Sequence, residues 1–143
     1  MSDIQEPLKT VIQVLHDSHK GFTDIGEHLK DPLAKNFFMR EAETRHTFEG
    51  ELKAAVGATD DVGGTVAGPV HRAWGDLKAN LGGGDHTLLA TAEQGEDAAK
   101  KAYQEALKSD KVSGTVRELL VRQQGHIQQA HDRVKAMRDA KAA

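Results

Sequence analysis

The sequence predicts an all-α protein built as a four-helix bundle, and three observations carry this prediction. Apolar residues recur at steps of three and four along four long segments, which is the spacing of amphipathic helices. Aromatic residues make up only 4% of the chain, whereas the helix-favouring residues Ala, Leu, Glu, Lys and Gln are abundant. Two short connections and one long one separate the segments, as expected for two antiparallel hairpins joined by a long crossover.

The first two predicted helices form one hairpin. The first helix extends from about Asp3 to Leu29. Its apolar face comprises Ile4, Leu8, Ile12, Leu15, Phe22, Gly26 and Leu29. Asp31 is expected to cap the second helix, with Pro32 in the first helical position, where proline is tolerated. The second helix then continues to about Val56.

The long crossover is expected at residues 57–84. It begins with the Gly-rich sequence GATDDVGGTVAGPV, contains a short helix over about residues 68–81 and ends in a glycine run, which acts as a helix stop. The third long helix starts at Asp85 and ends near the sequence KSDK, and the fourth extends from about Lys111 to Arg138. Residues 1–143 are therefore expected to form a single domain.

Composition argues against several classes of function. The formal net charge is -3 and no basic stripe is present, so a nucleic-acid partner is not expected. Apolar runs stay far below the ~20 residues of a membrane span, and the N-terminal sequence lacks a signal-peptide pattern. We therefore expect a cytoplasmic protein with no membrane partner. The chain has no cysteine and no serine beside an inward histidine and carboxylate, which argues against a hydrolase.

Each of the four helices carries at least one polar side chain within its apolar face. These residues are His19 on the first helix, Glu41 and Arg45 on the second, Glu96 on the third, and Gln123 and His131 on the fourth. They fall near mid-height of the bundle, His131 only if the third helix starts beside the loop of the first hairpin. A carboxylate in this place must be neutralised, paired with a cation or bound to a metal.

Two hypotheses explain this inward polar layer. In the first, His19, Glu41, Glu96 and His131 bind a metal, most simply iron, with manganese or zinc as alternatives. Around that metal, Arg45 and Gln123 would orient the carboxylates, and Tyr103 would donate a hydrogen bond or an electron. In the second, Glu96 and Glu41 pair with Arg45, and His19 and Gln123 complete a hydrogen-bond network. The protein is then a non-catalytic structural or interaction protein without a metal.

Other residues are runners-up as metal ligands. Glu43 and His46 form a Glu-x-x-His pair, the spacing that di-iron bundles use, but helix phase points both away from the apolar face. His16 precedes His19 in the sequence HDSH and lies at the flank of its helix. His126 is also a runner-up, although its phase favours an exposed or flanking position.

Outside the inward layer, His71, Arg72 and Trp74 form a compact group on the short helix of the crossover. We interpret Trp74 as an anchor that packs this helix onto the bundle, because a single tryptophan is far more often buried than a partner-binding residue. The alternative is a patch that binds a partner.

The sequence also resembles a known family. The segments DSHKGF, RHTFEGEL, HRAWGDL, GEDAAKKAY and HDRVKAMRD resemble, in this order, the landmarks of the PA2169 family of four-helix-bundle proteins, a bacterial domain of unknown function in the ferritin-like superfamily. The similarity covers nearly the whole chain. It implies a ferritin-like bundle with the crossover between the second and third helices.

The resemblance also implies an iron or di-metal site in the bundle core and a stress-related role. If the protein is catalytic, the bound metal would carry out redox chemistry, as an oxidase or peroxidase acting on O2 or H2O2. The sequence departs from the di-iron pattern at two places. His19 stands where a carboxylate is expected, and the fourth helix has QQGH (Gln123 to His126) in place of Glu-x-x-His. A monomer or a dimer is the expected assembly.

Overall fold

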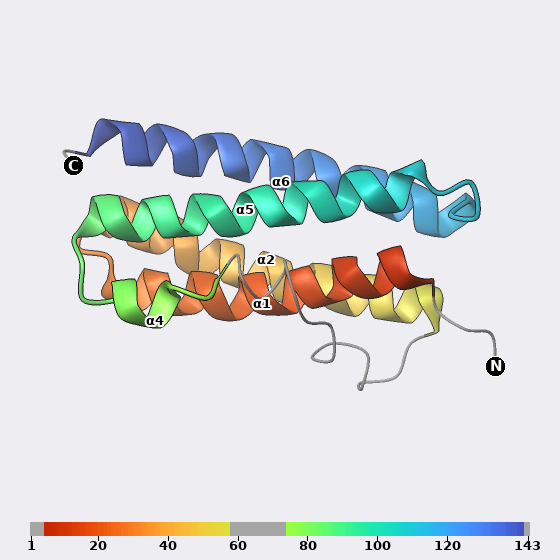
Figure 1. Cartoon of the computed structure of the whole chain (residues 1–143), viewed down its shortest axis with the longest axis horizontal. Coiled ribbons are helices and arrows are strands. Elements are labelled where there is room, and N and C mark those ends of the chain that lie inside the picture. Colours follow the sequence, from red (N-terminus) through yellow and green to blue (C-terminus); the bar gives the residue numbers. More distant parts are fainter. Residues whose placement is uncertain (1–4, 58–73, 142–143) are drawn as a thin grey trace.

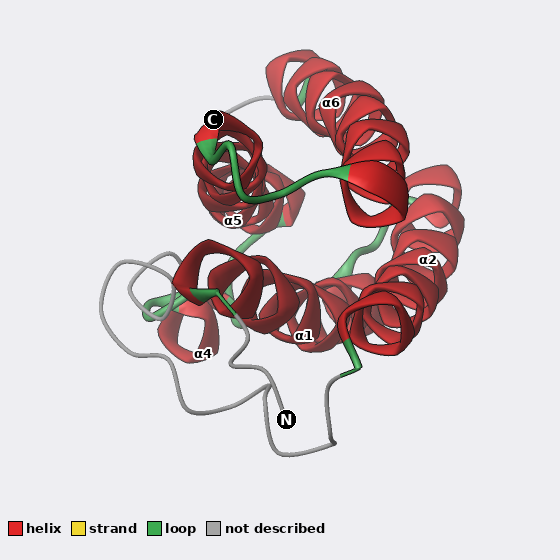
Figure 2. Cartoon of the chain, turned by 90° about the vertical axis from the view of Figure 1, so that its right-hand side faces the viewer, coloured by secondary structure: helices red, strands yellow, loops and turns green. Residues whose placement is uncertain are grey.

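Four long helices lie side by side along the longest axis of the molecule (Figure 1), and the end view shows them around a common core (Figure 2). The computed structural model of the chain describes residues 5–57 and 74–141. Its helices are α1 (Glu6–His28), α2 (Pro32–Val56), α4 (Leu77–Asn80), α5 (Asp85–Lys108) and α6 (Gly114–Ala140). The predicted all-α four-helix bundle is confirmed, and the described residues contain no strand.

The two hairpins pack with α5 beside α1 and α6 beside α2, so that α2 and α5 face each other across the bundle (Figure 2). The start of α5 lies at the loop of the first hairpin. There the Asp85 carboxylate accepts hydrogen bonds from the backbone N–H groups of Lys30, at 2.9 Å, and Asp31, at 3.0 Å. This is the arrangement on which the inclusion of His131 in the mid-height layer depended.

Local chemistry sets the helix ends. The Asp31 side chain caps α2 by accepting hydrogen bonds from the N–H groups of Leu33 and Ala34, with Pro32 in the first turn, as predicted. Gly57 ends α2 in the left-handed conformation, with φ of 69°, which glycine adopts without strain.

Two predicted boundaries need correction. The last long helix begins at Gly114, later than the expected Lys111, because residues 109–113 form a turn. In this turn Val112 N–H donates to the Ser109 carbonyl at 3.3 Å, and the Val112 side chain is buried at the end of the bundle. The short helix α4 covers only Leu77–Asn80 of the expected 68–81, and the part of that range before Trp74 lies outside the described residues.

The core consists of two apolar clusters, one towards each end of the bundle. One contains Leu15 and Phe48, and the other contains Phe22 and Ala42. Along α2, Arg45 lies between Ala42 of one cluster and Phe48 of the other. The polar layer therefore separates the two clusters at mid-height. Apolar packing on both sides removes water from the layer, which strengthens the electrostatic interactions within it.

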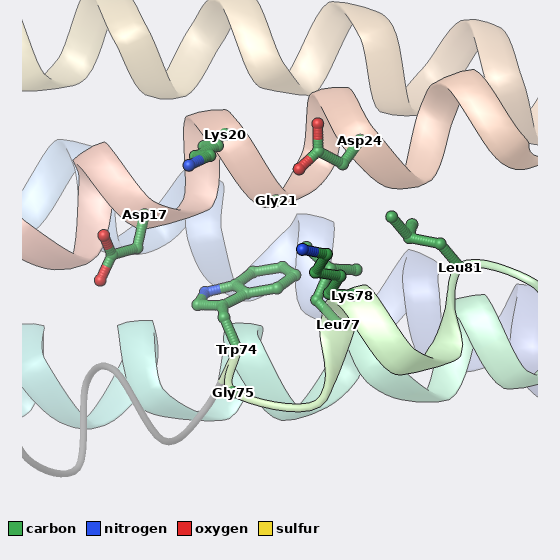
Figure 3. A pocket seen from close by; sticks show the side chains of 9 residues that line it. All are labelled: Asp17, Lys20, Gly21, Asp24, Trp74, Gly75, Leu77, Lys78 and Leu81. Carbon is green, nitrogen blue, oxygen red and sulfur yellow. The ribbon is translucent and has the colours of Figure 1, made fainter.

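Trp74 anchors the end of the crossover on the bundle, as interpreted from the sequence. Its indole lies against Gly21 of α1 (Figure 3) and also against Gly95 of α5, and its ring meets Phe22 edge-on at 6.1 Å. A Cβ atom at Gly21 would come within 2.6 Å of the indole, and one at Gly95 closer still. The two glycines therefore make the slot that receives the ring. His71 and Arg72 lie outside the described residues.

We expect Gly95→Ala to lower the free energy of unfolding by about 1–3 kcal/mol, because the added methyl group must push the indole out of its slot. Gly50→Ala is the matched control, since no atom lies within 4 Å of the added Cβ there, and it should gain about 0.5–1 kcal/mol from improved helix propensity. Urea unfolding, followed by the fluorescence of the single tryptophan, measures both. Equal stability of Gly95→Ala and the wild type would show that Trp74 does not occupy this slot.

Candidate functional site

The buried polar layer is organised around Arg45. Its side chain is 0% exposed, and its guanidinium donates to both carboxylate oxygens of Glu96, from Nη1 at 2.6 Å and from Nη2 at 2.8 Å. Nη2 also donates to Glu41 Oε2 at 3.3 Å, and the Phe22 ring lies 4.7 Å from the guanidinium carbon. Burial alone would lower the pKa of Arg45, but Glu96 and then Glu41 raise it above its ordinary value, so this side chain stays charged.

Glu41 links this pair to the surface through His126. The imidazole Nε2 of His126 lies 2.9 and 3.0 Å from the two Glu41 oxygens, and its side chain is 37% exposed between α2 and α6. Burial would raise the pKa of Glu41, but the hydrogen bond from His126 and the charge of Arg45 lower it, and the net result is a lowered pKa. The Glu41 carboxylate therefore remains ionised although it is buried.

A second chain of hydrogen bonds starts at the hydroxyl group of Tyr103. Its hydroxyl donates to Gln123 Oε1 at 2.8 Å, and Gln123 Nε2 donates to the Phe48 carbonyl at 3.2 Å and to Glu51 Oε1 at 3.3 Å. Burial raises the pKa of Tyr103 far above its ordinary value. The tyrosine therefore keeps its proton and uses it to hold the Gln123 amide, which in turn ties α6 to α2.

The four predicted metal ligands do not share one site. Glu41 and Glu96 both accept hydrogen bonds from Arg45. His131 instead contacts Asp97 on the α5–α6 side of the bundle, with 2.9 Å between Nε2 and Oδ1. His19 contacts His46 on the α1–α2 side, with ring centroids 4.8 Å apart.

The predicted burial of His19 needs correction. It was expected near the centre of the apolar face of its helix, but the structure places Ser18 there, with 0% exposure, and leaves His19 half-buried. A shift of one residue turns a helical side chain by about 100°, so a small error in phase decides which of two neighbours is inside.

The runners-up divide into two groups. Glu43 and His46 are exposed on α2, as helix phase predicts, and His16 is also exposed, with Nδ1 3.5 Å from Glu49 Oε2. His126, however, is part of the polar layer through Glu41. Its spacing of three residues from the buried Gln123 was the sequence signal for this, because residues three apart lie on neighbouring parts of a helix face.

Between α5 and α6 the predicted ligand His131 meets two carboxylates, Glu93 and Asp97, that were not expected from the sequence. Glu93, Asp97 and His131 each offer one carboxylate oxygen or imidazole nitrogen, and these atoms all lie within 4.8 Å of one another. His131 is 7% exposed and Asp97 is exposed, so the cluster lies at the edge of the core. We call Glu93, Asp97 and His131 the α5–α6 cluster.

A groove runs along the other side of the bundle beside Trp74, between α1 and α4 (Figure 3). Its volume is about 460 Å³. It is lined by Asp17, Lys20, Gly21, Asp24, Trp74, Gly75, Leu77, Lys78 and Leu81. None of these residues belongs to the polar layer, so the groove and the layer are separate features.

The fold and the layer together define a class of protein: an all-α four-helix bundle with charged residues from facing helices at its centre. The chain belongs to the family described as a domain of unknown function (DUF2383), whose model matches residues 3–109, more than half of the chain. This confirms the family resemblance and covers Glu41, Arg45 and Glu96. No curated protein matches the chain. Among the described helices, none is both long and apolar enough to cross a membrane.

The lowered pKa of Glu41 predicts how stability changes with pH. A carboxyl group whose pKa is lower in the folded than in the unfolded protein stabilises the fold at pH values above its unfolded pKa. This stabilisation is lost as the pH falls through the folded pKa. Between about pH 7 and about pH 3, Glu41→Gln should therefore lose less unfolding free energy than the wild type. Urea unfolding across this range measures the difference.

Glu43→Gln serves as the control for this experiment, because Glu43 is an exposed carboxylate on the same helix. It should follow the wild-type pH dependence. If Glu41→Gln and the wild type lose the same free energy on acidification, the Glu41 carboxylate is not stabilised by Arg45 and His126.

Proposed function

We propose that this protein is a non-catalytic structural or interaction protein whose polar layer holds the bundle together without a metal. The observation that supports this most directly is the bidentate pairing of Arg45 with Glu96. The same guanidinium also donates a hydrogen bond to Glu41. In bundles that hold metal, inward carboxylates from facing helices surround a cation. Here the guanidinium supplies that positive charge between carboxylates of α2 and α5.

The hydrogen-bond inventory supports this proposal. Both oxygens of Glu96 are used by Arg45, and both oxygens of Glu41 contact His126. A metal that bound these carboxylates would have to displace a fully buried guanidinium, which would then lie unpaired among apolar side chains. Leaving one member of a buried ion pair without its partner costs about 3–5 kcal/mol.

Access also favours a structural role for the layer. Arg45, Glu96, Tyr103 and Gln123 are each 0% exposed, so they offer no surface to a substrate in this conformation. Two side chains at the edge of the layer reach solvent: His126, whose Nε2 is directed at Glu41, and Glu51, which accepts from Gln123. A reaction at this layer would require the helices to separate.

The competing hypothesis is an iron-binding bundle with oxidase- or peroxidase-type activity in a stress context. It requires His19, Glu41, Glu96 and His131 to converge, whereas these residues lie in three different places. Its ligand on α6 would be His131, but His131 contacts Asp97, and the α6 residue within the layer is Gln123, bonded to Tyr103. The contacts therefore favour the ion-pair network over a core metal site.

A double-mutant cycle tests the proposal. Arg45→Met and Glu96→Met should each lower the free energy of unfolding by about 3–5 kcal/mol, because the first leaves Glu96 without its cation and the second leaves Arg45 with only the longer contact to Glu41. The double variant should cost clearly less than the sum, since an apolar pair can replace a buried ion pair at little cost. Urea unfolding measures all three, with exposed Glu43→Met as the matched control.

Metal loading distinguishes the two hypotheses on the same proteins. After Fe(II) loading and desalting of untagged protein, elemental analysis should find the same iron content in the wild type and in Glu96→Met. Near-stoichiometric iron that the wild type retains and Glu96→Met loses would contradict the proposal. Additive effects of the two single substitutions on stability would also contradict it.

A further inference from the structure

The α5–α6 cluster has an unusual hydrogen-bonding problem. His131 Nε2 lies 2.9 Å from Asp97 Oδ1 and 3.9 Å from Glu93 Oε2, while its Nδ1 lies 3.1 Å from Asp132 Oδ1. Ionised carboxylates only accept hydrogen bonds, and a neutral imidazole carries one N–H. If Nδ1–H donates to Asp132, Nε2 keeps a lone pair close to the carboxylates of Asp97 and Glu93. A metal ion between these atoms would bind the lone pair and the two carboxylates together.

The surroundings of His131 favour a metal ion. Histidines that bind metals usually donate their other N–H to a carboxylate, which fixes the ring and raises its basicity. Asp132 is in this place, and it is itself held by Gln128 Nε2 at 3.0 Å. The His131 side chain is only 9% exposed, so packing as well as these hydrogen bonds determines the orientation of its ring.

We propose that Glu93, Asp97 and His131 bind a divalent transition-metal ion, with Zn²⁺ and Mn²⁺ as the best chemical match. One imidazole and two carboxylates suit these ions. Metal–ligand distances of about 2.0–2.2 Å in a tetrahedral site place ligand atoms roughly 3.3–3.6 Å apart. The observed separations of 2.9 and 3.9 Å from Nε2 lie on either side of this range. The Asp97 side chain is 62% exposed, which leaves room for water as a further ligand.

The charges that face the cluster leave it able to take a cation. Arg138 pairs with Glu93 through Oε1, which leaves Oε2 directed towards His131, and the same guanidinium also contacts Asp139. Lys100 lies near enough to Asp132 to lower the pKa of that carboxyl, although the hydrogen bond with His131 is the largest cause. Three carboxylates, those of Glu93, Asp97 and Asp132, thus lie around His131, and Arg138 pairs with only the first of them.

This site is independent of the proposed role of the polar layer. The layer involves Arg45 and Glu96, while the metal site involves the outer part of the α5–α6 contact and none of the same residues. Substitutions at Arg45 or Glu96 therefore test the layer alone, and substitutions at Asp97 or His131 test the metal site alone. Either proposal can fail without the other.

Isothermal titration of the untagged full chain with ZnCl2, and separately with MnCl2, tests the metal site. We expect one ion of Zn²⁺ bound per chain, at least tenfold weaker binding in His131→Ala and Asp97→Asn, and a loss of roughly 10–100-fold in Asp132→Asn, which leaves all three ligands in place. Glu105→Gln, an exposed change on α5, should bind as the wild type does.

A second readout shows which histidine binds, because the chain has eight. In NMR spectra of the imidazole nitrogens, Zn²⁺ should shift Nε2 of His131, and His19→Ala should leave both this shift and the affinity unchanged. Zinc binding that persists in His131→Ala and Asp97→Asn, or the lack of any binding by a folded wild type, would overturn the proposal.

Discussion

A single constraint organises the interior: the guanidinium of Arg45 is fully buried and needs anionic partners there. Its main partner, Glu96, lies on α5, which faces α2 across the bundle (Figure 2), so this ion pair joins the two hairpins through the centre. Sliding one hairpin along the other, or turning it, would break two short hydrogen bonds and leave charge unpaired. We infer that the pair sets the register of the hairpins.

Contacts at the end of the bundle support the same register. Asp85 accepts hydrogen bonds from the backbone at Lys30 and Asp31, which fixes the start of α5 on the loop of the first hairpin. The Trp74 indole, seated against Gly21 and Gly95, holds α1 and α5 at one separation. These contacts and the central ion pair thus favour the same relative placement of the hairpins.

The sequence predicted features that depend on one helix at a time, such as the cap at Asp31 and the separation of four helices by two short loops and a crossover. It left open whether Glu96 faces Arg45 or a metal, because that choice depends on how α2 and α5 approach each other. A one-residue phase difference exchanged Ser18 for His19 in the core. The α5–α6 cluster was missed because Asp97 is exposed, and no apolar pattern indicates that it meets His131.

The central claim is that a guanidinium occupies the place between Glu41 and Glu96 where bundles of related architecture hold metal. A crystal structure of the protein grown in excess Mn²⁺, with an anomalous difference map, tests it most directly. We predict bidentate density between Arg45 and Glu96 and no anomalous peak between the two carboxylates. A manganese peak bridging Glu41 and Glu96, with Arg45 displaced, would contradict the claim and restore the core metal site.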